Sequence, residues 1–176
     1  QSRVNSDLIG KIINIGSRCA KFINKDFNDS LAVSLENNSL IEECLSYKKE
    51  IIQNYELRNY STNVRLISSL ADKINKYLDS EKPWVKIKND SDKELVQKIC
   101  TDGLNLFRIL IGYLKPILPN VSKKTEDILM SESINWQNLD QLLLNKKINK
   151  FEPIIRRIDN EDIVSMKNFN RGENNG

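Results

Sequence analysis

Hydrophobic residues recur every three or four positions along most of the chain, which is the spacing of one face of an α-helix. The pattern is clearest over residues 6–24, where a narrow apolar stripe contains Leu8, Ile12, Ile15, Cys19 and Phe22. The opposite face is polar and carries Asp7, Lys11, Asn14, Arg18, Lys21 and Lys25. Such a helix packs its apolar face against the rest of the molecule. Gly16 borders that face, and we expect another backbone to approach closely there.

Further segments repeat the helical pattern. They cover residues 39–55, 61–78, 91–114 and 122–130, and a last short helix is expected over 160–167. Ser39 with Glu42, and Ser91 with Glu94, have the spacing of capping boxes, in which two side chains satisfy backbone amides at a helix start. Pro83 is expected to separate two helices because it forces the preceding residue out of helical geometry.

Short connections between long amphipathic helices are typical of a bundle. The sequence therefore predicts an all-α fold, an antiparallel helix bundle, in one domain over residues 1–160. Residues 161–176 are expected to form a C-terminal tail whose final stretch, RGENNG, is disordered.

Composition excludes several kinds of chemistry. The chain has 176 residues and no histidine, so it builds no histidine-dependent triad, zinc site or acid–base catalyst. Cys19, Cys44 and Cys100 are far apart and form no CxxC pair, and we expect them to be small buried hydrophobic residues in a reducing compartment. No phosphate-binding loop or nucleophile motif is present. The sequence thus predicts neither a catalytic residue nor a metal site.

Charge and hydropathy bear on the partners. A net charge of +3 is too small to indicate nucleic-acid binding by itself. No apolar run approaches the ~20 residues of a membrane span, and the first residues lack the apolar core of a signal peptide. We therefore expect a cytoplasmic protein with no membrane partner.

Two features are candidate recognition sites. Asn14 and Arg18 are four residues apart and therefore adjacent on the polar helix face, where an amide and a guanidinium offer planar hydrogen-bond patterns to base edges or phosphates. Trp84 directly follows Pro83, and an unpaired base that stacks on an indole contributes about 1–3 kcal/mol. The same residues also fit a plain solvated helix face and an indole that closes the end of the bundle. The residues alone leave both alternatives open.

Four blocks of sequence resemble, in order, the C-terminal anticodon-binding domain of bacterial methionyl-tRNA synthetases, which are class I enzymes. The blocks are VNSDLIGKIINIGSRCAKFINK at 4–25, LADKINKYLDSEKPWVKIK at 70–88, KICTDGLNLFRILIGYLKPILP at 98–119 and LLLNKKINKFEPIIRRID at 142–159. They contain an N-x-x-S-R helix and a K-P-W corner. In the KINKF motif, lysines stand where relatives carry His and Pro.

The resemblance implies a helix bundle that binds the CAU anticodon of methionine tRNAs. In the family, the asparagine and arginine of the N-x-x-S-R helix and the tryptophan of the P-W corner contact the anticodon. Those positions match Asn14, Arg18 and Trp84, and the tryptophan stacks on the first anticodon base, a cytosine. Single-stranded loops are read in this way, by stacking splayed bases on aromatic rings and by hydrogen bonds to their exposed edges.

The resemblance also implies what the chain lacks. The family's HIGH-type and KMSKS-type signatures and zinc knuckle are absent from these residues, so the chain itself is expected to need no cofactor. The parent enzyme would use ATP, with Mg and Zn, to attach methionine to its tRNA, and the expected partners are methionine tRNA and the catalytic domain of the same enzyme. Candidate secondary contacts with either partner are Lys11, Lys88 and Arg157. Two alternatives stay open: the same domain of an isoleucine, valine or leucine enzyme, and a helical protein-interaction module.

Overall fold

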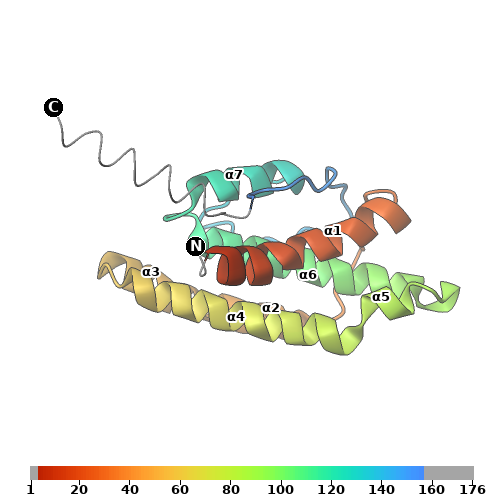
Figure 1. The fold of residues 1–176 in the computed structure, drawn as a ribbon, viewed down its shortest axis with the longest axis horizontal. Helices are drawn as coiled ribbons and strands as arrows, with labels where there is room; N and C mark the ends of the chain where they lie inside the picture. The colour runs from red at the N-terminus through yellow and green to blue at the C-terminus, as the bar shows by residue number, and fades with distance from the viewer. Residues whose placement is uncertain (1–3, 157–176) are drawn as a thin grey trace.

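The computed structural model describes residues 4–156 as a bundle of helices with an irregular segment laid along one side (Figure 1). Its helices are the π-helix η1 (Val4–Ile13), α1 (Asn14–Asp26), α2 (Asn38–Ser46), α3 (Lys48–Glu56), α4 (Tyr60–Glu81), α5 (Pro83–Lys86), the short 3₁₀ turn η2 (Asp90–Asp92), α6 (Lys93–Leu114) and α7 (Pro119–Ile128). Extended pairing within this part of the chain is limited to an isolated bridge between Ser30 and Lys147. The expected all-α fold is confirmed.

The directions of the helices follow from contacts between them. Lys11 pairs with Asp72, and Arg18, seven residues later, pairs with Asp79, so α1 and α4 run parallel. Helix α6 runs the other way, since Gly16 of α1 lies against Phe107 and Cys19, one turn later, lies against Gly103. Helix α2 runs in the same direction as α6, since Asp102 binds the backbone before α2 and Tyr113 binds the carbonyl of Cys44 near its end. The bundle is therefore antiparallel, as expected, and Figure 1 shows α6 between α1 and the α2–α4 layer.

Helix α6 is the centre of the molecule. Every residue from Thr101 to Leu114 is buried, because α1, α2, α4 and α7 all pack against it. A helix that is buried on all sides is expected to be hydrophobic on all sides. The LNLFRILIGYL stretch of α6 has this composition, and its exceptions are Asn105 and Arg108. The polar residues buried with it therefore need partners.

Those polar residues form a column on α6, here called the polar ladder, and they hold two connecting loops. The ladder consists of Gln97, Thr101, Asp102, Asn105 and Arg108. Its first three members bind backbone groups of residues 30–37, and the last two bind backbone groups of residues 138–143. Leaving such a buried group unpaired costs about 1–3 kcal/mol. The ladder therefore fixes where both loops lie.

Gly16 allows α1 to pack close to α6. The sequence predicts that another backbone approaches this glycine, but the atoms that approach it belong to a side chain. A Cβ atom at Gly16 would lie 2.6 Å from two ring carbons of Phe107, a distance that real Cβ atoms essentially never show. The flat ring fills the space that a side chain would need.

The expectation of burial for Cys19, Cys44 and Cys100 is confirmed, and all three are free thiols.

Both predicted capping boxes are wrong. Helix α2 is capped by Asn37, whose Oδ1 accepts the N–H of Leu40 at 3.1 Å, while the Ser39 hydroxyl donates to that same oxygen. Asparagine caps as well as serine, and Asp102 fixes the chain at Asn37 by accepting its backbone N–H. Helix α6 is entered through the η2 turn, so neither Ser91 nor Asp92 provides a side-chain cap.

Other boundaries also differ from the sequence prediction. The helix expected over 39–55 is divided at Tyr47 into α2 and α3, and the Ser46 hydroxyl beside this break donates to the carbonyl of Glu43. The first helix begins as a π-helix, whose i→i+5 winding the α-helical pattern of the sequence does not predict. The helix expected over 160–167 and the RGENNG tail lie outside the described residues.

No described helix is both long enough and apolar enough to cross a bilayer.

Candidate nucleic-acid interface

Helix α1 supplies the first two predicted site residues. Asn14 is the first residue of α1, directly after the π-helix, and Arg18 lies one turn further on. Burial of Ile15, Cys19 and Ala20 on the opposite side fixes the rotation of the helix. Asn14 and Arg18 therefore lie half-exposed on one face, as the periodicity predicts.

The corner between α4 and α5 supplies the third residue. Lys82 adopts the left-handed conformation (φ 48°, ψ 55°) and its N–H closes α4 by donating to the carbonyl of Leu78. Pro83 then starts α5 and is buried, which places Trp84 on the outer side of the turn. An ion pair of 2.6 Å between Glu81 and Lys86 spans the corner. The predicted break at Pro83 is confirmed.

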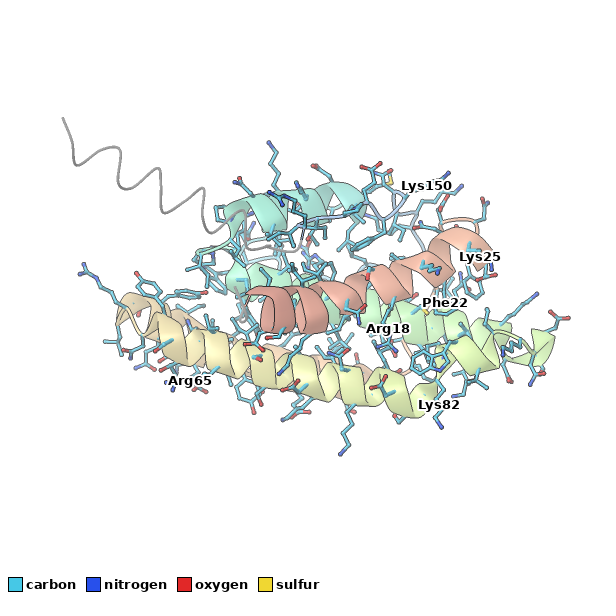
Figure 2. All side chains as sticks on the ribbon, in the orientation of Figure 1. Arg18, Phe22, Lys25, Arg65, Lys82 and Lys150 are labelled. Atoms are coloured by element: carbon cyan, nitrogen blue, oxygen red, sulfur yellow. The ribbon has the colours of Figure 1, made fainter. Side chains whose placement is uncertain are left out.

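The structure brings Arg18 and Trp84 into direct contact, although 65 residues separate them in the sequence. The guanidinium carbon of Arg18 lies 4.6 Å from the centroid of the Trp84 ring, which is a cation–π geometry. The same guanidinium pairs with Asp79 of α4 at 3.2 Å. Figure 2 shows Arg18 directed from α1 toward the end of α4, where Lys82 is labelled. Asp79 is a member of this site that the sequence analysis missed, because nothing in the sequence pairs two positions so far apart.

The two tryptophans of the chain have different surroundings. Trp136 packs against the hydrophobic core, next to the rings of Tyr55 and Tyr113. Trp84 is half-buried but is not among the described hydrophobic residues that pack against the core. The alternative in which Trp84 closes the end of the bundle therefore has less support than the alternative of a surface platform.

Asn14 keeps its side-chain amide free. Its backbone carbonyl accepts a hydrogen bond from the Ser17 hydroxyl at 3.2 Å, but its side chain makes no hydrogen bond within residues 4–156. A half-exposed amide of this kind has two donors and an acceptor available to a ligand.

The candidate secondary contacts do not join this group. Lys11 forms ion pairs with Asp72 at 3.0 Å and with Asp7 at 3.9 Å, so carboxylates already neutralise its charge. Lys88 is exposed after α5, and within the described residues no hydrogen bond or cation–π contact joins it to Asn14, Arg18 or Trp84. Arg157 lies outside the described residues. All three stay predictions.

A buried carboxylate anchors α4 near the site. Asp102 of the polar ladder accepts the Tyr77 hydroxyl at 2.7 Å, two residues before Asp79. Burial raises the pKa of Asp102 to about 6, although hydrogen bonds from Tyr77 and from the amides of Glu36 and Asn37 oppose the shift. The end of α4, and with it the Trp84 corner, is thereby tied to the centre of the bundle.

The hollows of the described residues lie apart from Asn14, Arg18 and Trp84. No cluster of His, Cys, Asp or Glu within 4–156 has the makings of a metal site. A hollow of about 420 Å³ lies between α7 and residues 149–154, and another of about 230 Å³ lies beside Trp136. Neither is lined by Asn14, Arg18 or Trp84. The geometry at Trp84 is instead a surface of stacking and hydrogen-bonding groups.

A family model described as the anticodon binding domain of methionyl tRNA ligase matches residues 32–173. The chain belongs to this family. The match includes Trp84 of the anticodon-binding domain, while Asn14 and Arg18 precede it. It also decides between the methionine enzyme and the isoleucine, valine and leucine enzymes in favour of methionine.

Solved structures share the fold of this anticodon-binding domain. The apo form of Mycobacterium tuberculosis methionyl-tRNA synthetase superposes with a TM-score of 0.81 and 16% identity, covering 90% of this chain and 34% of that one. The same enzyme with bound methionyl-adenylate gives a TM-score of 0.80, again at 16% identity, covering 88% of this chain and 32% of that one. The chain therefore spans about a third of the length of these enzymes.

Proposed function

We propose that this anticodon-binding domain recognises the CAU loop of methionine tRNAs through Trp84, Arg18 and Asn14. Trp84 stacks on the first anticodon base, the cytosine, and the two polar side chains bind base edges or phosphates beside it. The observation that carries the proposal is the contact between Arg18 and Trp84 at 4.6 Å, with the unpaired amide of Asn14 one turn away.

The chemistry of the three groups supports this assignment. An indole on a surface corner offers its face to any base, while a guanidinium and an amide supply the directional hydrogen bonds that distinguish one base edge from another. Arg18 and Trp84 come from helices that pack on the same core, so their separation is fixed before RNA binds. Such pre-organisation lowers the entropic cost of binding.

In this proposal the guanidinium of Arg18 exchanges one partner for another, Asp79 in the free protein and RNA in the complex. In the structure, its guanidinium covers one face of Trp84 and pairs with Asp79, whose side chain is 62% exposed. Exposed ion pairs contribute about 0–1 kcal/mol, so an incoming phosphate or base edge can replace Asp79 at little cost. A base then stacks on the indole in the place that the guanidinium leaves.

The wider function follows from the family. We infer that the chain is part of a cytoplasmic methionine–tRNA ligase, which uses ATP to attach methionine to its tRNA. The relative with bound methionyl-adenylate supports this inference. The domain's partners are then methionine tRNA and the catalytic part of the same enzyme.

The direct test compares two RNA hairpins. An anticodon stem-loop with the CAU loop is titrated against the chain by fluorescence anisotropy, and the titration is repeated with the first anticodon base changed from C to U. We expect the CAU hairpin to bind more tightly, because the stacked base is read at its edge. Equal affinity for both hairpins would contradict the proposed recognition, and no binding of either would favour a protein-interaction module.

A further inference from the structure

The polar face of α1 continues beyond Arg18 with two more cations. Lys21 and Lys25 lie three and seven residues after Arg18, so they fall on the same face of the helix. Both are exposed, and neither has a carboxylate partner within the described residues. With a rise of 1.5 Å per residue, Lys25 lies about 10 Å further along the helix axis than Arg18.

A third cation reaches this end of α1 from the irregular C-terminal segment. Asn24 holds that segment in place: its Nδ2 donates to the carbonyl of Asn149 at 3.2 Å, and its Oδ1 accepts the N–H of Phe151 at 3.1 Å. Lys150 lies between these two contacts, exposed and without a carboxylate partner in residues 4–156. Figure 2 labels Lys25 in the last turn of α1 and Lys150 above that end of the helix.

Several other cations on this side of the bundle form ion pairs, although the exposed Lys82 and Lys88 of the Trp84 corner have none within the described residues. Lys11, Lys86, Lys93 and Lys98 are each paired with a carboxylate. Of the nearby acids, Asp29 accepts a hydrogen bond from Asn24, and neither Asp26 nor Asp29 forms an ion pair with these lysines within the described residues. The ammonium groups of Lys21, Lys25 and Lys150 are thus left without an ion-pair partner among residues 4–156.

We propose that Lys21, Lys25 and Lys150 form a phosphate-binding strip that holds the sugar–phosphate backbone of the anticodon stem. This inference rests on the proposed function, which places the loop at Trp84. The stem then leaves the loop along α1, and the strip contacts its backbone without reading sequence. Phosphate contacts of this kind set the position and orientation of a nucleic acid, while base contacts supply specificity. The modest net charge of +3 is compatible with this role because the charge is concentrated where the stem passes.

The test separates stem from loop. A triple variant, Lys21→Gln, Lys25→Gln and Lys150→Gln, is titrated with a CAU anticodon stem-loop and, separately, with the single-stranded loop nucleotides alone, each over a range of salt concentrations. A control variant with the same change in charge replaces exposed cations away from the Trp84 corner with Gln: Lys49, Arg65 and Lys123. Circular dichroism melts verify that both variants are folded.

We expect the strip variant to bind the stem-loop at least about tenfold more weakly, with a slope of log affinity against log salt that is smaller by about 2 to 3. Its affinity for the loop alone, and its preference for C over U at the first anticodon position, should not change. Equal losses for the stem-loop and the loop alone would overturn the strip. An unchanged stem-loop affinity, or an equal loss in the control variant, would do the same.

The outcome distinguishes the strip from the proposed function. If the chain binds C and U hairpins equally but the strip variant weakens both, the base readout fails and the strip stands. If the chain prefers C and the strip variant binds like the original chain, the recognition site stands and the strip fails.

Discussion

Arg18 and Trp84 meet at 4.6 Å although they belong to helices that are neither consecutive nor directly joined. One face of the indole is covered by a cation that is itself held by Asp79. The contact gives the site a defined geometry before any ligand arrives.

Replacing Trp84 with Ala should weaken binding of the CAU stem-loop by about 1–3 kcal/mol, which is the contribution of one stacked base. Trp84→Phe should restore part of the loss, since a smaller aromatic face remains. The melting temperature should change little, because Trp84 is set apart from the core. Trp136→Ala is the matched control: it should lower the melting temperature strongly and leave the affinity of the folded protein unchanged. Fluorescence anisotropy and thermal melts measure both quantities.

Arg18→Ala and Arg18→Lys should differ in RNA binding and hardly differ in stability. Either variant removes a partly exposed ion pair, which contributes about 0–1 kcal/mol to folding. If Arg18 binds a phosphate, Ala should reduce the salt slope by roughly 0.7 and Lys should retain it. If Arg18 binds a base edge, both variants should lose the preference for C, because Lys lacks the planar fork. Salt titrations with C and U hairpins measure both effects, and binding by Arg18→Ala that equals that of the original chain would exclude either role.

Gly16→Ala should destabilise the fold by about 1–3 kcal/mol, the usual cost of inserting a methyl group into a filled core. The added carbon would lie 2.6 Å from the Phe107 ring and would push α1 away from α6. Gly10→Ala, at an exposed position of η1, is the matched control and should leave stability unchanged or slightly raised. Urea denaturation measures the difference. Phe107→Leu combined with Gly16→Ala should recover part of the loss, and additive losses would contradict the steric account.

Asp102 should make the domain less stable as the pH rises from about 4 to about 6. Its pKa is raised to about 6 in the folded protein, mainly by burial, whereas an unfolded aspartate has a pKa of about 3.9. Between these values the folded state binds more protons, so the free energy of unfolding falls with rising pH, by up to about 3 kcal/mol. Glu36, whose negative charge also raises the pKa, faces the same carboxyl group.

Urea unfolding of the original chain and of Asp102→Asn, each at about pH 4 and pH 7, tests this contribution. The variant loses an acceptor for a backbone N–H and should be less stable at both pH values. The pH-dependent part of the difference isolates Asp102 from the other carboxylates. A variant whose stability changes with pH as much as that of the original chain would show that Asp102 does not titrate in this range.

Much of the fold could be predicted from hydrophobic spacing. The apolar stripe of residues 6–24 correctly gives the buried face of the first helix, and the break at Pro83 follows from the geometry of proline. Helix starts could not be predicted in the same way. Asn37 is held at the start of α2 because its backbone N–H donates to Asp102, a residue distant in sequence. A local capping motif contains no information about such a partner.

The candidate site, like the fold, could be predicted only in part from the sequence. Asn14, Arg18 and Trp84 were identified as candidates because their residue types and positions are visible in the sequence. Their arrangement was not, since the contact of Arg18 with Trp84 and its ion pair with Asp79 depend on how α1 packs beside α4. The role of Lys150 is also hidden in the sequence, because the hydrogen bonds of Asn24 are what bring it to the end of α1.

The polar ladder of α6 affects how the two connecting loops unfold. Amides in loops usually exchange their hydrogens quickly, because loops open locally at little cost. Here the N–H groups of Ala32, Asn37 and Leu143 donate to buried side chains of the central helix. They are released only when that helix is itself exposed to water. These loop amides should therefore exchange as slowly as those of the core, and two irregular segments far apart in sequence should unfold together with the bundle as one cooperative unit.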